Sequence, residues 1–267
     1  MNYWWIMDKK YHFISGLPRS GSTLLTAILR QNPKFYSDVT DPLMIYVLSV
    51  INSNIERSNR SMMPEHRIKN TINGIFDGFY KNIDGDVIFN CNRGWTKYVE
   101  YLYQLNSNFK IICCVRSIAW ILNSYEKLYK SRTLRDPTLT SIYSLSNEET
   151  TKSVWHRTDF LMESGMVRKS YSNLKEAFYG PYKKHLCLID YDNLVNNTTD
   201  TMKKIYDFID EPYYEHDFNN VIYSNEDYDD ASFTPNMHTI KQKIENTNSE
   251  IILPPDIWQR YYSTNWD

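Results

Sequence analysis

The stretch HFISGLPRSGSTLLTAIL, residues 12 to 29, determines how the rest of the chain must be arranged. The run from Tyr11, just before this stretch, to Gly16 is rich in residues that favour strands and stops at a glycine. From Gly21 onward, apolar residues recur at helical spacing until Pro33 ends the pattern. The sequence therefore predicts a strand, a tight turn and a helix, which is the unit that builds α/β folds.

The turn between this strand and helix has almost the pattern of a nucleotide-binding P-loop. From Gly16 it reads Gly, four residues, Gly21, Ser22 and Thr23, but the lysine of ATP- and GTP-binding loops is missing. Backbone N–H groups at a helix start, with the helix dipole behind them, can hold one phosphate without that lysine. The hydroxyls of Ser20, Ser22 and Thr23 would add donors. A turn without any ligand is the alternative, and the clustering of Gly, Ser and Thr disfavours it.

The composition limits the partners that this chain can have. Its 267 residues, 42% of them hydrophobic, suffice for one domain with a sizeable core, spanning residues 1 to 267. A formal net charge of −2 provides no overall basic field for nucleic acid or an anionic membrane. Any anion site must therefore be local.

The cysteines and the start of the chain indicate a compartment. The four cysteines lie in apolar, strand-like contexts without metal-ligand spacing, which favours buried thiols and no metal. The opening residues MNYWWIMDKK lack the basic region of a signal peptide, and no later stretch approaches a membrane span. We expect a cytoplasmic protein, whose oligomeric state the sequence does not indicate.

Strands alternate with helices along the remaining chain. Residues 41 to 81 read as helical with breaks near Pro64 and Gly74, and Ser146 with Glu149 forms a capping box opening a helical stretch to about residue 178. Three further stretches, each followed by a helix, read as strands: residues 86 to 90, 110 to 116 and 185 to 191. This order predicts a three-layer α/β/α fold with a central parallel sheet, whose ligands bind at the carboxyl ends of the strands. The segment from residue 213 reads as a long loop over that ligand.

Two strand ends indicate which ligand the loop does not suit. In nucleoside triphosphate sites, a lysine and Mg²⁺ share the charge of the terminal phosphates, and an acidic residue at a strand end helps to hold the metal. The corresponding strand ends here are Asn90 and Arg116, which cannot play that acidic role. The loop is better suited to a donor whose transferred group carries less charge and needs no metal.

This combination resembles the sulfotransferase family, whose members transfer a sulfuryl group from 3′-phosphoadenosine 5′-phosphosulfate (PAPS) to a hydroxyl or amine. The resemblance covers about residues 11 to 245 and implies a P-loop-like sulfotransferase fold, with PAPS as donor and adenosine 3′,5′-bisphosphate as product. The family's 5′-phosphosulfate loop is similar to the run Pro18-Arg19-Ser20-Gly21-Ser22-Thr23, which the resemblance assigns to the donor.

Two further motifs extend the resemblance. IICCVRSIAWILNSY, a buried strand ending in arginine with a serine about two helical turns later, assigns Arg116 and Ser124 to the 3′-phosphate. The guanidinium suits a doubly charged phosphate, while a surface salt bridge is the alternative for Arg116. LIDYDNLVNNTTDTMKKIYDFID, residues 188 to 210, is a weaker match to the family's tyrosine-acidic-x-leucine segment.

The catalytic roles are less well defined. Arg19 would act as a fixed cation that stabilises the leaving oxygen. The small-molecule sulfotransferases have a lysine and a histidine after the strand at 86 to 90, where this chain has NCNRGW, with neither. Many bacterial relatives have Asp-Lys before Arg-Gly-Trp, and Asn90 and Cys91 replace that pair. The usual basic contact is therefore in doubt, although Arg93 could approach the same place. Other members take a base from the region after the first helix, which offers Asp38 and Asp41. We favour Asp41, although either aspartate could be an N-cap of the next helix.

Three more residues complete the predicted site. Arg93 and Trp95 would line the acceptor pocket, with a core position as the equal alternative for Trp95. Lys241, three residues after His238, would close over the 3′-phosphate as basic loops do in the family, or lie in a solvated loop. The predicted function is a PAPS-dependent sulfotransferase with an unidentified acceptor. The alternatives are a small-molecule kinase with a degenerate loop and a non-catalytic adenosine 3′,5′-bisphosphate-binding protein of the same fold.

Overall fold

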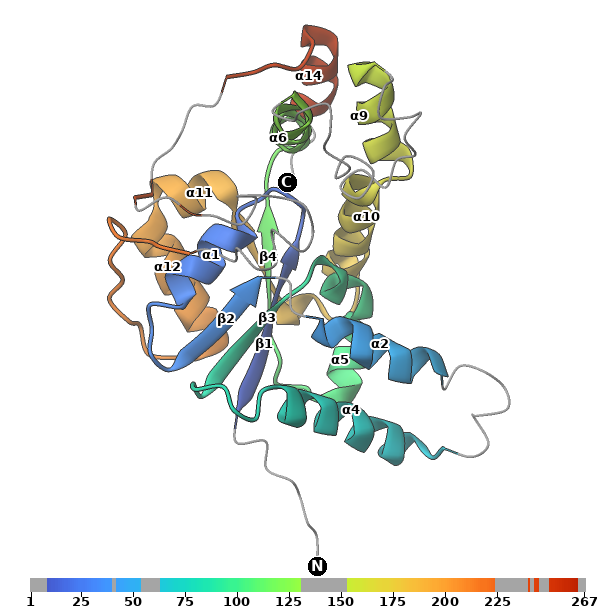
Figure 1. Cartoon of the computed structure of the whole chain (residues 1–267), viewed down its shortest axis with the longest axis vertical. Coiled ribbons are helices and arrows are strands. Elements are labelled where there is room, and N and C mark those ends of the chain that lie inside the picture. The colour runs from blue at the N-terminus through green and yellow to red at the C-terminus, as the bar shows by residue number, and fades with distance from the viewer. Residues whose placement is uncertain are drawn as a thin grey trace, which may run out of the picture.

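The chain folds around a sheet of five parallel strands in the order β2-β3-β1-β4-β5 (Figure 1). The computed structural model describes residues 9–39, 42–53, 63–130, 153–223, 240, 243–244 and 250–263. The strands are β1 (Lys10–Gly16), β2 (Phe35–Val39), β3 (Val87–Cys91), β4 (Ile111–Val115) and β5 (Leu186–Asp190). The predicted α/β fold with a central parallel sheet is confirmed.

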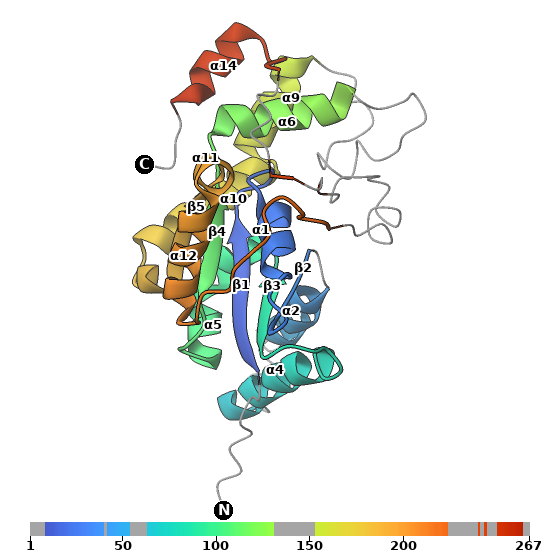
Figure 2. The same cartoon turned by 90° about the vertical axis from the view of Figure 1, so that its left-hand side faces the viewer.

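Helices cover both faces of the sheet, and three more lie beyond the carboxyl ends of the strands. In Figures 1 and 2, α1, α11 and α12 lie on one face, α2, α4, α5 and α10 on the other, and α6, α9 and α14 at the end. The described helices are α1 (Ser22–Leu29), α2 (Leu43–Ser53), α4 (Glu65–Phe79), the 3₁₀ helix η1 (Arg93–Tyr98), α5 (Val99–Leu105), α6 (Ile118–Lys130), α9 (Val154–Glu163), α10 (Met166–Tyr179), the 3₁₀ helix η2 (Lys183–His185), α11 (Tyr191–Asn196), α12 (Thr198–Ile209) and α14 (Pro255–Tyr262).

Alternating strand residues divide the core in two. In β4, Ile111, Cys113 and Val115 pack against the helices of one face, while Ile112 and Cys114 face the other. All five residues are at most 3% exposed, because a central parallel strand is covered on both sides. The continuous apolar run in the sequence follows directly from this double burial.

The structure corrects several expected element boundaries. β2 was not predicted, because its inward-facing Ser37 interrupts the apolar alternation; the serine is buried and its hydroxyl donates to Thr26 Oγ1 at 3.3 Å. The expected break at Gly74 is wrong, since α4 continues through it and is held by the buried Ile72 and Phe76. A single glycine costs a helix only about 1 kcal/mol, which packing outweighs.

The long helix expected up to residue 178 is two helices in its described part. α9 begins after Ser153, whose hydroxyl accepts from the His156 N–H, and ends before Gly165. A Cβ on Gly165 would lie 2.7 Å from Leu161 Cα, so the turn into α10 requires a glycine. The expected capping box lies outside the described residues. α14 was not predicted.

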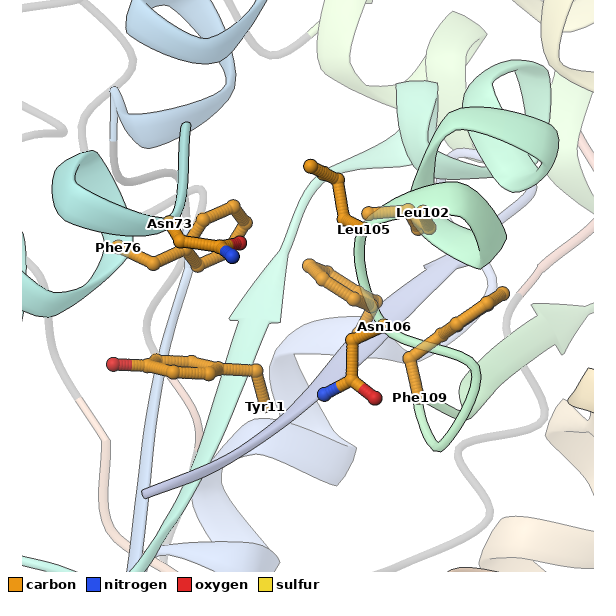
Figure 3. A pocket seen from close by; sticks show the side chains of 8 residues that line it. Tyr11, Asn73, Phe76, Leu102, Leu105, Asn106 and Phe109 are labelled. Atoms are coloured by element: carbon orange, nitrogen blue, oxygen red, sulfur yellow. The ribbon is translucent and has the colours of Figure 1, made fainter. Parts of the chain in front are cut away.

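One small apolar pocket lies at the amino ends of the strands, far from the turn after β1 (Figure 3). It has about 20 Å³ of free space, enough for one water molecule. Its lining includes Tyr11 and Phe13 of β1, Phe76 of α4, and Leu102 and Leu105 of α5. A space of this size is too small for a substrate, and the sequence motifs lie at the other end of the sheet, after β1 and β4.

Candidate functional site

The turn after β1 begins with a glycine that the sheet requires. Gly16 has a φ of +111°, and a Cβ on it would lie 2.2 Å from the Cys114 carbonyl oxygen of β4. The next N–H, of Leu17, donates to that same oxygen at 2.8 Å. The close approach to β4 fixes the direction in which the turn leaves the sheet.

The helix start in this turn has no side-chain cap among the described residues. Gly21 is the N-cap of α1 with a φ of +95°, and no side chain in the described part of the chain bonds to the first N–H groups of the helix. Ser22 and Thr23 are partly exposed in the first turn, while Pro18 is buried. Uncapped N–H groups with the positive end of the helix dipole are suited to an anion. That this loop holds a phosphate stays a prediction.

The Ser20 side chain does not face a ligand. Its hydroxyl is completely buried, donates to the Cys114 carbonyl at 2.9 Å and lies against the Leu17 carbonyl. The expectation that this hydroxyl is an additional donor to a phosphate is therefore wrong. Ser20 closes the loop onto β4, and only its backbone is left for a ligand.

Three arginines converge beside this loop. Arg19 lies within the loop with a φ of +58°, Arg93 follows β3 at the start of η1, and Arg116 follows β4. Burial lowers the pKa of the Arg19 guanidinium, and the positive charges of Arg116 and Arg93 lower it further. No carboxylate of the described residues acts on Arg19, although arginine remains protonated at neutral pH. The site is thus locally cationic in a protein of net charge −2.

Arg19 is also linked to α6. Its Nε donates to Ser124 Oγ at 3.0 Å, and its charge together with that of Arg93 acts on the buried Tyr125 hydroxyl. Burial raises the pKa of Tyr125, and the two arginines oppose that shift. The structure therefore brings Ser124 into the site, bonded to Arg19; its assignment to a 3′-phosphate stays a prediction.

Arg116 is held by aromatic rings and leaves donors unused. Its guanidinium carbon lies 3.9 Å from the centre of the Tyr191 ring and 5.6 Å from that of Trp120. Its buried Nε has no hydrogen-bond partner among the described residues, and Nη1 reaches only the Arg19 carbonyl at 3.5 Å. The neighbouring Ser117 Oγ is likewise buried and without a partner there. Unpaired donors at the end of a buried strand suit an anionic ligand better than a salt bridge.

Sequence reasoning missed Ser117, and it noted the segment around Tyr191 only as a weak motif. The Tyr191 ring also bounds the phosphate loop, since a Cβ on Gly21 would lie 2.9 Å from its Cδ2. Tyr191 thus contacts both the loop and Arg116. The signal for it was the match of LIDYDNLV to the tyrosine-acidic motif.

Most of the side chains at the end of β3 and just after it have a structural role. Asn90 is 1% exposed, donates to the Tyr80 hydroxyl at 2.8 Å and accepts from Trp95 Nε1 at 2.6 Å. Trp95 is also 1% exposed and packs 4.6 Å from the Phe13 ring, so its predicted place in an acceptor pocket is wrong. Arg93 is exposed, and Ser15 Oγ donates to its carbonyl at 3.0 Å.

The structure defines no catalytic base. Asp38 lies on β2 and is not an N-cap; it accepts from the Val39 N–H at 2.8 Å and from the Tyr223 hydroxyl. Asp41 and Lys241 lie outside the described residues, as does His238. Within the described ranges, no cluster of three His, Cys, Asp or Glu side chains could hold a metal ion. The described helices also include none that is long and apolar enough to cross a membrane.

Comparisons with solved structures agree with this fold. The sulfotransferase domain from the curacin biosynthetic pathway is 15% identical with a TM-score of 0.59, covering 96% of this chain and 97% of that domain. The sulfotransferase domain from the Synechococcus PCC 7002 olefin synthase is 13% identical with a TM-score of 0.51, covering 96% and 94%. A sulfotransferase from Alicyclobacillus acidocaldarius is 13% identical with a TM-score of 0.50, covering 86% and 92%. At such low identities, these structures support the fold alone.

The match of this chain to a family model shows which family it belongs to. No curated protein sequence matches the chain significantly. The model described as "Sulfotransferase family" matches residues 12–215, which include the phosphate loop, the arginine after β4 and the tyrosine-acidic segment. The chain is therefore a member of the sulfotransferase family.

Proposed function

We propose that this sulfotransferase-family protein uses PAPS as its donor and transfers the sulfuryl group to a hydroxyl or amine. The observation that carries the proposal is the convergence of three guanidinium groups on an uncapped helix start. PAPS presents two separate anionic groups, the 5′-phosphosulfate and the 3′-phosphate, to such a site. Its sulfuryl group would be transferred as the bond to the phosphate oxygen breaks and one to the acceptor forms.

The unpaired donors of the site agree with these two groups. The N–H groups at the start of α1, with the partly exposed Ser22 and Thr23, would hold the 5′-phosphosulfate. Arg116, whose Nε is buried without a partner among the described residues, would hold the 3′-phosphate through paired N–H donors. The only carboxylates that raise the pKa of Arg116 are Asp190 and Asp192 among the described residues, and Asp190 already accepts from two N–H groups of α11.

Arg19 would stabilise the charge that develops on the leaving phosphate oxygen. Its position in the loop, fixed by the bond to Ser124, is preorganised for this role. Arginine cannot serve as the base, because it stays protonated. The proton of the acceptor must therefore pass to another group or to solvent, and Asp41 remains our predicted base.

A thermal-shift titration tests the donor site. Adenosine 3′,5′-bisphosphate should raise the melting temperature of the wild type. A ligand that binds only the native state increases the free energy of unfolding by about 2.7 kcal/mol when its concentration is one hundred times its Kd. The Arg116→Ala variant should lose most of this stabilisation, whereas Arg168→Ala, which removes an exposed arginine of α10, should retain it. Stabilisation by ATP with Mg²⁺ alone would contradict the proposal and indicate a kinase-like protein.

Turnover is tested separately, by release of adenosine 3′,5′-bisphosphate from PAPS with panels of alcohols, phenols and amines. Release should depend on the acceptor and should be lost in Arg19→Ala, while nucleotide binding largely persists. Unchanged turnover in Arg19→Ala would refute the proposed role of this residue.

A second candidate is a protein that binds adenosine 3′,5′-bisphosphate without catalysis. It is favoured by Asn90, which with Cys91 replaces the Asp-Lys pair expected in bacterial relatives and is bonded to Tyr80 and Trp95. Binding of the bisphosphate without turnover on any acceptor would support this candidate over the enzyme.

A further inference from the structure

Arg116 is part of a column of side chains that ends on a distant helix. Its guanidinium lies between the rings of Tyr191 and Trp120, at 3.9 and 5.6 Å. The Trp120 ring in turn packs edge to face against Trp258 of α14, with 4.8 Å between the ring centres and 86° between the planes. The column Tyr191-Arg116-Trp120-Trp258 thus connects α11, the start of α6 and α14.

α14 has a defined position on α6 (Figure 2). The carboxamide of Asn123, which is 1% exposed, donates to the Glu250 carbonyl at 3.0 Å and accepts from the Ile252 N–H at 2.9 Å. Ile257 is completely buried, so α14 also contributes to the core. The segment that leads into α14 is therefore bonded to Asn123, the residue before Ser124, and lies next to the candidate site.

α14 is also attached to α9. Trp155 Nε1 donates to Asp256 at 2.8 Å, and Arg260 pairs with Asp159 at 3.2 Å. These contacts are exposed and contribute little stability individually. They show that α14 contacts α9 as well as α6.

The column restricts the Arg116 side chain before any ligand binds. Arg116 has no ion pair among the described residues, and its one hydrogen bond, at 3.5 Å, is at the limit of such bonds. A flexible guanidinium without partners would lose side-chain entropy on binding a phosphate. Contact with aromatic faces restricts the guanidinium in advance without using its N–H donors, because a cation–π contact involves the face of the cation.

We infer that α14 is a positioning element for the nucleotide site, in which Trp258 supports Trp120 and the two tryptophans together with Tyr191 hold Arg116 oriented for the 3′-phosphate. This inference rests on the proposed function. It assigns to Trp120 and Trp258 an effect on nucleotide binding through Arg116, since neither indole needs to contact the ligand.

Calorimetric titration with two nucleotides tests the inference. The ratio of the Kd of adenosine 5′-monophosphate to that of adenosine 3′,5′-bisphosphate measures what the 3′-phosphate contributes. In Trp120→Leu this ratio should fall about five- to thirtyfold, the size of a partly desolvated cation–π contact. In Trp258→Leu, which removes the support of Trp120 and keeps its contact with Arg116, the ratio should fall in the same direction by a smaller factor. The Kd of the monophosphate should stay unchanged, which also shows that each variant is folded.

Three controls sharpen the test. Arg116→Ala should abolish the preference for the bisphosphate. Trp258→Phe keeps an aromatic ring in the column and should therefore retain most of the preference that Trp258→Leu loses. Trp155→Leu removes another tryptophan that contacts α14 but lies outside the column, and should leave the ratio as in the wild type.

The outcomes separate this inference from the proposed function. Wild-type ratios in Trp120→Leu and Trp258→Leu, or an equal fall in Trp155→Leu, would overturn the role of the column while leaving the donor site intact. A wild type that binds neither nucleotide, or binds both equally, would refute the proposed donor site and the column with it.

Discussion

Replacing Gly16 by alanine tests whether the phosphate loop depends on the close approach of β1 to β4. The residue has a φ of +111°, where an alanine is strained by about 1–2 kcal/mol. The new Cβ would also lie 2.2 Å from the Cys114 carbonyl oxygen, which is backbone and cannot rotate away. Overpacking of this kind costs about 1–3 kcal/mol, so Gly16→Ala should lower the free energy of unfolding by about 2–5 kcal/mol.

The assay is urea unfolding followed by tryptophan fluorescence, with Gly74→Ala as the matched control. Gly74 lies in α4, and a Cβ there would meet nothing within 4 Å, so alanine should stabilise the protein by about 0.5–1 kcal/mol. The two substitutions add the same methyl group and should have opposite signs. A Gly16→Ala variant within about 0.5 kcal/mol of the wild type would refute the inferred geometry of the loop, because a strained core position cannot be neutral.

Two further predictions concern buried titratable side chains. Burial lowers the pKa of His12 to about 4, with Lys10 and Lys110 adding to the shift, so the folded state binds fewer protons than the unfolded one. The resulting contribution to the free energy of unfolding, about 3 kcal/mol, is complete above pH 6.5 and is lost as pH falls toward 4. The variant His12→Asn keeps an acceptor for the Lys110 N–H, so its urea midpoint should vary less with pH over that range. A pH dependence as steep as that of the wild type would contradict this. Arg157→Met leaves Glu126 buried without its 2.6 Å partner and should cost about 3–5 kcal/mol in urea unfolding. Adding Glu126→Leu should restore most of the loss, and a double variant as unstable as the single one would argue against a charge effect.

Most of the fold could be predicted, because its strands are apolar on both faces. The runs around Phe13, Ile112 and Ile189 form strands as expected, since most residues on both faces of these covered strands are hydrophobic. β2 escaped prediction because Ser37 occupies an inward position, with its hydroxyl satisfied by Thr26. That compensation depends on tertiary contact between α1 and β2, which local pattern does not contain.

The candidate site was predicted in its residue types but not in its side-chain directions. Arg19, Arg116 and Ser124 do lie together, because strand ends and the helices after them share one edge of a parallel sheet. Ser20 and Trp95 turn inward instead, since each finds a buried partner, Cys114 for the hydroxyl and Asn90 for the indole. A serine or a tryptophan is compatible with either direction, and only the packing around it decides.

The topology of the sheet explains why the three arginines meet. β3, β1 and β4 are neighbours in the sheet, and each is followed at its carboxyl end by one of the arginines. Gathering like charges at a half-buried edge is unfavourable in the free protein. Burial is the main cause that lowers the pKa of Arg19, and the charges of Arg116 and Arg93 lower it further. An anionic ligand removes this repulsion in addition to forming its own hydrogen bonds. If the proposed nucleotide binds here, the free energy that the fold gives up in assembling the arginines would return on binding, which would favour a multiply charged nucleotide over a neutral one.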